Sequence, residues 1–296
     1  MSLSVGIDLG GTHVRAALVD QSGKIITMIQ EETEAHKGYT YVIDKMIKLA
    51  EKLIVNQTIK GIGIGAPGPL DYKTGVILSP PNLPGWEKVP IVNLIANHFN
   101  VPVYLNNDAN VAALAEARIG SGRDYESVYY ITVSTGIGGG FVINKQIFNG
   151  AQGYAGEIGN MILNPNGYKH SNLNKGSFES YSSGTAIGRV AAERLHMSGG
   201  AKQVFSLADE GNELAQNIIE EAVSHLAMGI ANIAHTVNPA VFVLGGGVMK
   251  SEKWILEPLR QKVKEFVFPE LARSIQIKPA ALGGHAGVVG AAMLVP

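Results

Sequence analysis

Three short segments rich in apolar residues open the chain. Ser4–Leu9, His13–Val19 and Lys24–Ile29 have the length and apolar content of β-strands, and a polar turn at Asp20–Gly23 separates the second from the third. From residue 42 to residue 54, apolar residues instead recur along one stripe, which is the pattern of an amphipathic helix. We therefore predict three strands followed by a helix.

The same patterns predict two further strands and two further helices before residue 118. In chain order these are a strand at Gly61–Gly65, a helix at Val92–His98, a strand at Val101–Leu105 and a helix that starts at Asp108 as its N-cap. The segment of residues 67–85 is rich in turn residues. This alternation of strands and helices fits one α/β lobe.

A second series of similar order begins near Ser127. Its predicted strands are Val128–Val133, Gly139–Asn144, Val241–Leu244 and Ile275–Pro279, and its predicted helices lie within Gly184–His235, Trp254–Phe268 and Ala286–Leu294. Glycine-rich turns at residues 9–12 and 136–140 occupy matching positions of the two series. We therefore expect a duplicated α/β fold with a ligand in the cleft between two lobes. The smaller lobe comprises residues 1–118 plus 285–296 and the larger one residues 119–284.

Composition narrows the function classes. Of the 296 residues, 46% are hydrophobic and 17% are charged, which argues against disorder. The net charge of −1 gives no basic surface for nucleic acid. The absence of cysteine excludes disulfides, a cysteine nucleophile and thiolate metal sites. No targeting or membrane segment is visible, so we expect a cytoplasmic protein.

Three glycine-rich turns follow predicted strands and are candidates for binding phosphate. They are Asp8-Leu-Gly-Gly-Thr12, Ser134-Thr-Gly-Ile-Gly-Gly-Gly140 and Gly245-Gly-Gly247. Glycines leave backbone N–H groups uncovered toward an anion, and a carboxylate such as that of Asp8 can hold a hydrated Mg²⁺. For the first turn the alternative is an ordinary hairpin. No Gly-Lys-Ser/Thr follows a glycine loop, so none is a Walker A motif.

Gly63-Ile-Gly-Ala-Pro-Gly68 matches the dinucleotide pattern G-x-G-x-x-G. Such a fingerprint must open a helix, and Pro67-Gly68-Pro69 prevents one from starting there. An NAD site is therefore not expected.

Two sets of polar residues are candidates for acid–base chemistry and for binding hydroxyl groups. Asn106-Asn-Asp-Ala-Asn110 lies at a strand-to-helix junction, where Asp108 suits a general base acting on an alcohol and the amides suit hydroxyl groups. The alternative is that Asp108 only caps its helix. Glu157 and Glu179 are placed to accept hydrogen bonds from sugar hydroxyls, or else form surface salt bridges.

Taken together, these residues resemble a ROK-family sugar kinase of the actin/hexokinase-like ATPase superfamily, in a glucokinase-like member without the zinc motif. The matching segments run in family order over essentially the whole chain. They are DLGGT at 8–12, GAPGPL at 65–70, NNDAN at 106–110, STGIGGG at 134–140, GEIG at 156–159, ESYSSGTAI at 179–187, LGGGV at 244–248 and AGVVGAA at 286–292.

The resemblance implies ATP- and Mg²⁺-dependent phosphorylation of a hexose hydroxyl, usually at C6, in a protein that is commonly a homodimer. Glucose is the first choice of substrate, with N-acetylmannosamine or a β-glucoside as alternatives. Asp108 matches the catalytic base. The implied sugar-binding positions are Gly65, Asn82, Asn107, Asp108, Glu157, Asn160 and Glu179. The implied nucleotide-binding positions are Asp8, Gly10, Gly11, Thr12, Thr135, Gly136, Gly138, Gly245, Gly246 and Gly247.

The chain departs from the family pattern at its zinc segment. Asn160 replaces the usual histidine, and His170, Asn172 and Ser177 stand where three cysteines are usual. Amides and a hydroxyl are poor Zn²⁺ ligands, so no structural zinc is expected. Some family members are sugar-responsive repressors with a DNA-binding helix-turn-helix before the first phosphate loop. The first strand here begins near residue 4, so we expect an enzyme rather than a regulator.

Overall fold

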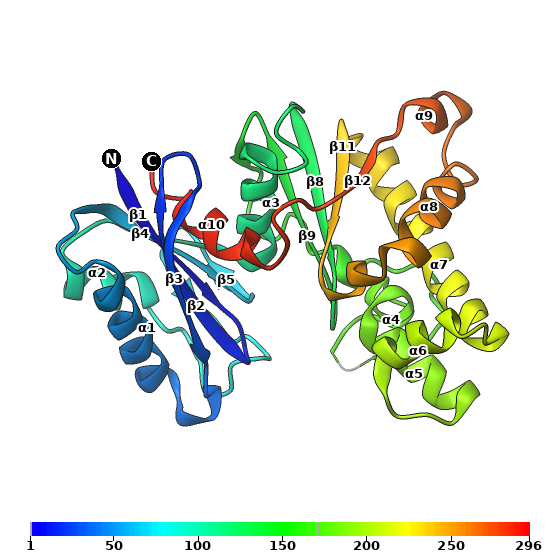
Figure 1. The fold of residues 1–296 in the computed structure, drawn as a ribbon, viewed down its shortest axis with the longest axis horizontal. Coiled ribbons are helices and arrows are strands. Elements are labelled where there is room, and N and C mark those ends of the chain that lie inside the picture. The colour runs from blue at the N-terminus through cyan, green and yellow to red at the C-terminus, as the bar shows by residue number, and fades with distance from the viewer. Residues whose placement is uncertain (1, 171) are drawn as a thin grey trace. The chain divides into compact units, whose positions relative to one another are not determined.

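The computed structural model describes residues 2–170 and 172–296, which fall into two compact units. Unit 1 comprises residues 1–123, 140–155 and 282–296, and unit 2 comprises residues 124–139 and 156–281. Each unit contains a mixed α/β layer structure (Figure 1). Unit 1 is thus built from three separate segments of the chain, and the last of them places the final helix against the first strands.

The sheet of unit 1 has the strand order β3-β2-β1-β4-β7. Its strands are β1 (Leu3–Leu9), β2 (His13–Asp20), β3 (Ile25–Glu32), β4 (Ile59–Ala66) and β7 (Val103–Asn107). The first three strands are antiparallel, whereas β4 and β7 run parallel to β1. A small hairpin, β5 (Leu70–Asp71) and β6 (Val76–Ile77), follows β4. This arrangement places the ends of β1 and β7 at one edge of the parallel part of the sheet.

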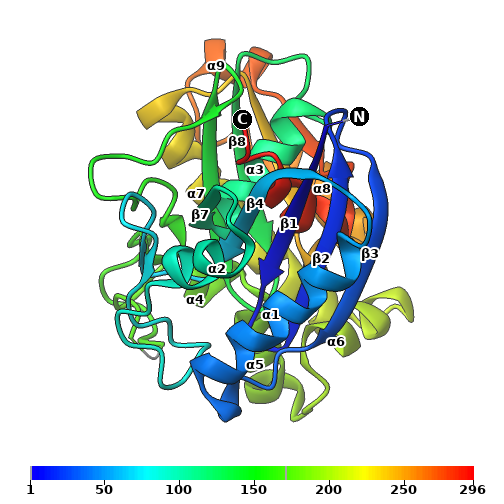
Figure 2. The same ribbon diagram turned by 90° about the vertical axis from the view of Figure 1, so that its left-hand side faces the viewer.

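Two helical layers cover the sheet of unit 1. One face carries α1 (Tyr39–Leu53) and α2 (Ile91–Phe99), and the other carries α3 (Asp108–Arg118) and α10 (Ala286–Ala292) (Figures 1 and 2). The alternation of β2 explains both layers, because successive side chains point to opposite faces. Val14, Ala16 and Leu18 belong to the core beneath α1, while Ala17 and Val19 pack with α10.

Close packing of α10 accounts for several glycines of unit 1. A Cβ at Gly63 of β4 would overlap the carbonyl oxygen of Ala291, and one at Gly6 of β1 would overlap that of Val288. Gly290 lies equally close to the backbone of Val111 in α3. These glycines let a helix backbone lie directly on strands and on a neighbouring helix. The G-x-G spacing of β4 therefore serves helix packing, and no helix follows it, as the prolines predict.

Unit 2 holds most of a second sheet, of order β10-β9-β8-β11-β12. Its strands are β8 (Ser127–Val133), β9 (Ile137–Ile143), β10 (Gln146–Ile147), β11 (Val241–Gly245) and β12 (Ile277–Pro279). Along the chain, β9 begins in unit 2 and ends in unit 1, to which β10 belongs. The helices of unit 2 are α4 (Glu179–Ser182), α5 (Gly184–Leu195), α6 (Gly200–Asp209), α7 (Glu213–Val237), α8 (Glu252–Val263) and α9 (Pro269–Ser274).

Short 3₁₀ turns link several of these elements. They are η1 (Ala35–Lys37), η2 (Ile158–Asn160), η3 (Gly247–Ser251) and η4 (Gly283–His285). The structure corrects one predicted helix boundary, because the helix expected at Trp254–Phe268 ends at Val263. Phe268 is extended and Pro269 starts a separate helix, since proline is favoured at the first helical position.

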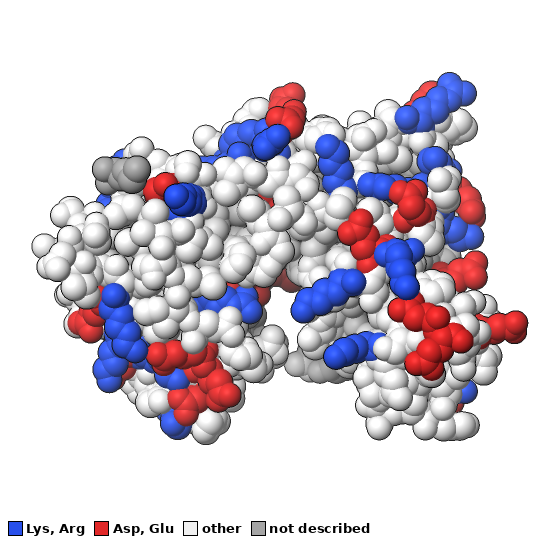
Figure 3. Space-filling view, in the orientation of Figure 1, with Lys and Arg blue, Asp and Glu red and all other residues white. Residues whose placement is uncertain are grey.

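Acidic and basic side chains intermingle on the face drawn in Figure 3. On that face the described residues form no continuous basic surface of the kind that nucleic-acid binders carry. Among the described residues, no helix combines the length and the apolar character that crossing a membrane requires.

Candidate functional site

Asp8 lies in β1 and faces a cation on the neighbouring strand. Its Oδ2 is 3.3 Å from Nη1 of Arg15, its register partner in β2, and its side chain is 19% exposed. The first turn of α10 closes on this carboxylate, because a Cβ at Gly287 would lie 2.8 Å from Oδ2. Burial raises the pKa of Asp8, and the positive charge of Arg15 only partly opposes that effect. The carboxylate is therefore poorly solvated.

These surroundings fit a hydrated Mg²⁺. That ion usually keeps several waters and takes only one or two protein carboxylates, with substrate phosphates completing its shell. Asp8 offers one such carboxylate, and a nearby cation would relieve the cost of its burial. Within residues 2–170 and 172–296, no group of three or more His, Asp or Glu side chains could hold a metal ion by itself.

The turn after β1 is braced from behind by Thr33. The N–H of Gly10 donates to the carbonyl of His13 (2.9 Å), which closes the turn. Thr33 is fully buried, and its Oγ1 donates to the carbonyl of Gly10 (2.6 Å) while its N–H donates to that of Thr12 (2.8 Å). Thr12 itself is exposed. Because these hydrogen bonds hold the turn from one side, its other side stays available to an anion. The sequence analysis did not identify Thr33, because this residue lies 23 positions after Gly10 in the chain.

Asn82 lies directly against this turn. A Cβ at Gly11 would come within 2.9 Å of the carbonyl oxygen of Asn82, so glycine is needed for the close approach. The structure thus brings Asn82, predicted to be a sugar-binding position, next to the first candidate phosphate turn.

Asp108 is the first residue of α3 and not its N-cap. Asn107 has the extended backbone of a cap (φ −63°, ψ 146°), and its Oδ1 accepts the N–H of Ala109 (2.9 Å). Oδ1 of Asp108 accepts the same N–H (2.8 Å) from a helical position, and Asp108 is exposed. The predicted capping role of Asp108 is therefore wrong, because its neighbour already holds the cap geometry. The carboxylate lies instead at the positive end of the helix dipole.

Gly65 lies beneath this junction. A Cβ on it would be 2.6 Å from Cγ2 of Val111 and 3.8 Å from Cα of Asp108. Gly65 is buried, and it lets β4 pack closely against the start of α3. The flanking amides Asn106 and Asn110 are also buried, at 5% and 2% exposure. The prediction that the flanking amides bind hydroxyls therefore does not hold for these two.

In unit 2, the side chains of Glu157 and Glu179 lie close enough for their charges to interact. Glu157 precedes η2, and Glu179 is the first residue of α4. Burial raises the pKa of Glu157, and the negative charge of Glu179 raises it further, although the Glu157 side chain keeps access to solvent. Oε2 of Glu179 accepts the N–H of Ile137 (2.7 Å), and a Cβ at Gly136 would overlap that same oxygen. The structure thus joins Glu179 to the second glycine turn.

The second and third glycine turns meet the N-terminus of α5. The N–H of Gly184 donates to the carbonyl of Ser134 (2.7 Å), and the N–H of Thr185 to that of Thr135 (3.3 Å). Ser134 and Thr135 are exposed. The glycine-rich turn with these exposed residues therefore lies beside the start of a helix, the kind of place where phosphate groups bind.

The third glycine turn follows β11. Gly246 has φ +94°, and a Cβ there would overlap the carbonyl of Val133, so only glycine fits the bend. A Cβ at Gly247 would lie 3.4 Å from Oγ of Ser134, which places this turn beside the second one. Gly245 is buried against the ring of Tyr130. The nucleotide-binding positions predicted in unit 2 therefore gather at one place.

Asn160 anchors the segment that replaces the zinc motif. Its Oδ1 accepts the N–H of Asn174 (2.6 Å), and Nδ2 of Asn174 donates back to the carbonyl of Asn160 (3.0 Å). The segment is closed further where the N–H of Gly176 donates to the carbonyl of Tyr168 (2.7 Å), and the guanidinium of Arg189 lies 3.9 Å from the centre of the Tyr168 ring. The predicted contact of Asn160 with sugar stays a prediction.

We expect purified protein to contain no stoichiometric zinc. Ser177 shares a buried hydrogen bond with Ser180 (2.6 Å between Oγ atoms), and Asn172 is exposed. Of the residues at the positions of the zinc motif, only His170 offers a nitrogen that binds Zn²⁺ well. A chelator should leave the melting temperature unchanged, since amide and backbone contacts close the segment. Elemental analysis that finds about one tightly bound zinc per chain would contradict this prediction.

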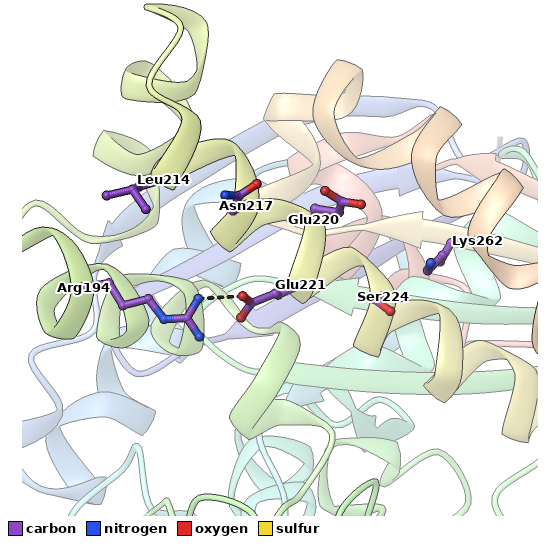
Figure 4. Close-up of a pocket in the computed structure, with 7 residues that line it drawn as sticks. All are labelled: Arg194, Leu214, Asn217, Glu220, Glu221, Ser224 and Lys262. Carbon is purple, nitrogen blue, oxygen red and sulfur yellow. Dashed lines mark hydrogen bonds and ion pairs between the residues drawn. The ribbon is translucent and has the colours of Figure 1, made fainter.

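An open hollow of about 360 Å³ lies elsewhere in unit 2, between α5, α7 and α8 (Figure 4). Its lining residues are Arg194, Leu214, Asn217, Glu220, Glu221, Ser224 and Lys262. Arg194 already pairs with Glu221 at 2.6 Å, and both side chains are half exposed. None of these residues belongs to a sequence motif, so this hollow is not the candidate site.

Comparison with known proteins gives one family, whose curated relatives include glucokinases and xylose repressors. The model of the ROK family matches residues 4–296. A glucokinase of Thermotoga maritima is 31% identical over 98% of this chain and 96% of its own length. A glucokinase of Halalkalibacterium halodurans is 33% identical over 98% of this chain and 94% of its own. A xylose repressor of Bacillus spizizenii is 29% identical over 99% of this chain but 76% of its own length.

Solved structures agree with the fold. A ROK hexokinase from Thermus thermophilus superposes with a TM-score of 0.87 at 32% identity, covering 99% of this chain and 97% of that one. A ROK-family glucokinase from Streptomyces griseus, in complex with glucose and AMPPNP, superposes with a TM-score of 0.86 at 30% identity over 99% of both chains. The predicted α/β fold of the actin/hexokinase-like class is therefore confirmed.

Proposed function

The chain belongs to the ROK family, and from this premise we propose that it is a sugar kinase, which transfers the γ-phosphoryl group of ATP to the C6 hydroxyl of glucose or a related hexose. The observation that carries the proposal is the exposed carboxylate of Asp108. Asn107 holds the cap geometry of α3, and Asp108 shares the N–H of Ala109 with it, so capping does not by itself require a carboxylate at Asp108. The two relatives named as glucokinases support the choice of reaction.

Asp108 acts as the general base in this proposal. Its carboxylate accepts the proton of the sugar hydroxyl while that oxygen forms a bond to the γ-phosphorus and the bond from phosphorus to the β,γ-bridging oxygen breaks, which releases ADP. The hydrogen bond from the N–H of Ala109 to Oδ1 fixes the carboxylate's direction. The positive end of the α3 dipole lies beside it, a position that favours negative charge.

The glycine turns bind the phosphates. In unit 1 these are Gly10, Gly11 and Thr12, with Asp8 as the carboxylate for Mg²⁺; in unit 2 they are Thr135, Gly136, Gly138 and Gly245–Gly247. When bound, Mg²⁺ neutralises charge that develops on the phosphoryl oxygens. Glu157, Glu179 and Asn107 bind the sugar hydroxyls, with Asn82, Gly65 and Asn160 at the border of the pocket. The raised pKa of Glu157, which partial burial and the charge of Glu179 cause, favours a partner that donates hydrogen bonds to its carboxylate.

A coupled assay of ADP release across a sugar panel tests the function. The panel contains glucose, fructose, allose, N-acetylmannosamine and a β-glucoside, and we expect the highest kcat/KM with glucose. The relatives named xylose repressors make a sugar-responsive regulator the second candidate. Sugar binding by calorimetry without ADP release from any sugar would favour that regulator over the kinase.

Glu157→Gln should raise stability at neutral pH while it weakens sugar binding. The raised pKa means that folding disfavours the ionised form of Glu157. The free energy of unfolding therefore falls as the pH rises above 4.5, the ordinary pKa of the group. Glutamine removes that cost at neutral pH, and its advantage disappears in acid, where the parent carboxyl is protonated. Loss of a charged acceptor should raise the sugar KM by roughly tenfold.

Melting temperatures of the parent and Glu157→Gln, measured at neutral and at acid pH, check the sign. Glu220→Gln, an exposed change in α7, serves as the matched control and should alter neither quantity. A Glu157→Gln protein that melts below the parent at neutral pH would show that ionised Glu157 stabilises the fold.

A further inference from the structure

Three asparagines form a connected chain of hydrogen bonds behind Asp108. Nδ2 of Asn106 donates to Oδ1 of Asn149 (3.0 Å), in the loop after β10. Oδ1 of Asn106 accepts both the N–H of Asn107 (2.8 Å) and Nδ2 of Asn110 (2.9 Å). Asn106 therefore connects the residue before Asp108, the residue two positions after it, and a loop 43 residues away in sequence.

The direction of every amide in this chain follows from one backbone group. The N–H of Asn107 can only donate, so the atom of Asn106 that faces it must be the oxygen. Asn106 then turns its Nδ2 toward Asn149, which must present an acceptor, and Asn110 must present its own Nδ2. The N–H of Asn107 thus fixes the orientation of Asn106, and Asn149 completes it by accepting the hydrogen bond from Nδ2 of Asn106.

The burial of this chain makes its polarity costly to change. Asn106 and Asn110 are 5% and 2% exposed, and Oδ1 of Asn110 has no protein partner among the described residues. A buried amide network that is nearly satisfied holds its members in one arrangement, because each broken bond leaves a desolvated group. The side chain of Asn110 donates its hydrogen bond to Asn106, which indicates that Asn110 holds the side chain of Asn106 in place.

We propose that Asn149, acting through Asn106 and Asn110, is a positioning residue for Asp108. This inference rests on the proposed function, in which Asp108 is the base. The amide chain holds Asn107 and the first turn of α3, and these hold the N–H of Ala109 that orients the Asp108 carboxylate. Asn149 itself touches neither Asp108 nor the reacting atoms in this role.

The test compares Asn149→Leu with Asn149→Asp. Leucine has a similar size but offers no acceptor, so Asn106 loses its anchor and kcat should fall by about tenfold to fiftyfold, with less than a twofold change in either KM. Aspartate keeps the acceptor oxygen and should restore kcat on the pH plateau to within about threefold of the parent. Its added negative charge should move the acid limb of the kcat profile to higher pH.

Ile95→Val is the matched control, since it removes one buried methyl group from α2 in the same unit. It should lower the melting temperature without lowering kcat, which separates positioning from a general loss of stability. An Asn149→Leu protein with kcat within about twofold of the parent would overturn the proposal, and so would an Asn149→Asp protein as slow as the leucine variant.

Hydrogen exchange keeps the proposal distinct from the proposed function. In Asn149→Leu, the amides of Asn107 and Ala109 should exchange at least about tenfold faster, while those of β1 stay as in the parent. Unchanged exchange at Asn107 would overturn the positioning role whatever the enzyme does. If the parent phosphorylates no sugar, the proposed function fails, and the exchange result alone then decides whether Asn149 holds the Asp108 junction.

Discussion

Asp108→Asn should lower turnover by roughly 10²–10⁴-fold, the usual range for loss of a general base. Asparagine keeps the size of the side chain and the oxygen that accepts the N–H of Ala109. It removes only the site that accepts the proton, so the KM for ATP should change little. Steady-state kinetics with the best sugar of the panel provide the measurement.

The same substitution should leave the fold intact. Asn107 supplies the cap of α3, so the expected loss is only that of a negative charge at a helix N-terminus, about 0.3–1 kcal/mol. Asp44→Asn, an exposed change in α1, is the matched control and should retain parental turnover. A folded Asp108→Asn protein with nearly parental turnover would remove Asp108 from the mechanism.

Gly63→Ala should destabilise unit 1 by about 3 kcal/mol or more, at the upper end of what overpacking costs. The added Cβ would overlap the carbonyl oxygen of Ala291, which is backbone and cannot rotate away. Either α10 or β4 must therefore shift. Thermal unfolding followed by circular dichroism should show the first transition lowered by roughly 6–12 °C.

Gly284→Ala provides the control within the same unit. Nothing lies within 4 Å of a Cβ built there, and its backbone is outside the left-handed region. We expect its stability to stay within about 0.5 kcal/mol of the parent. A Gly63→Ala protein that melts like Gly284→Ala would mean that α10 does not rest on β4 as described.

Much of the fold is predictable from local pattern. The apolar run that predicts β2 and the apolar stripe of α1 are both confirmed, because each can be recognised from local pattern alone. The absence of a helix directly after β4 also needed only local chemistry, since two prolines and a glycine at residues 67–69 interrupt a helical turn. Boundaries were less predictable: β7 begins at Val103, two residues after the predicted start.

The candidate site depends more on long-range contacts. Sequence alone placed the cap at Asp108, one residue too far along, because Asn and Asp are equally good caps and only the backbone angles distinguish them. It did not identify Thr33, Asn149 or Asn174 as supporting residues. Each meets its partner across a turn or loop, and no periodic pattern records such a pairing.

The sequence by itself determined the family, the α/β class and the residue types of the candidate site, because ordered motifs and apolar periodicity survive without any knowledge of packing. Only the tertiary structure decided which polar side chains face solvent and which form hydrogen bonds with one another. Asp108 is exposed while Asn106 and Asn110 are buried within the same five-residue motif. The reason is physical: burial and hydrogen-bond partners are set by segments that arrive from distant parts of the chain.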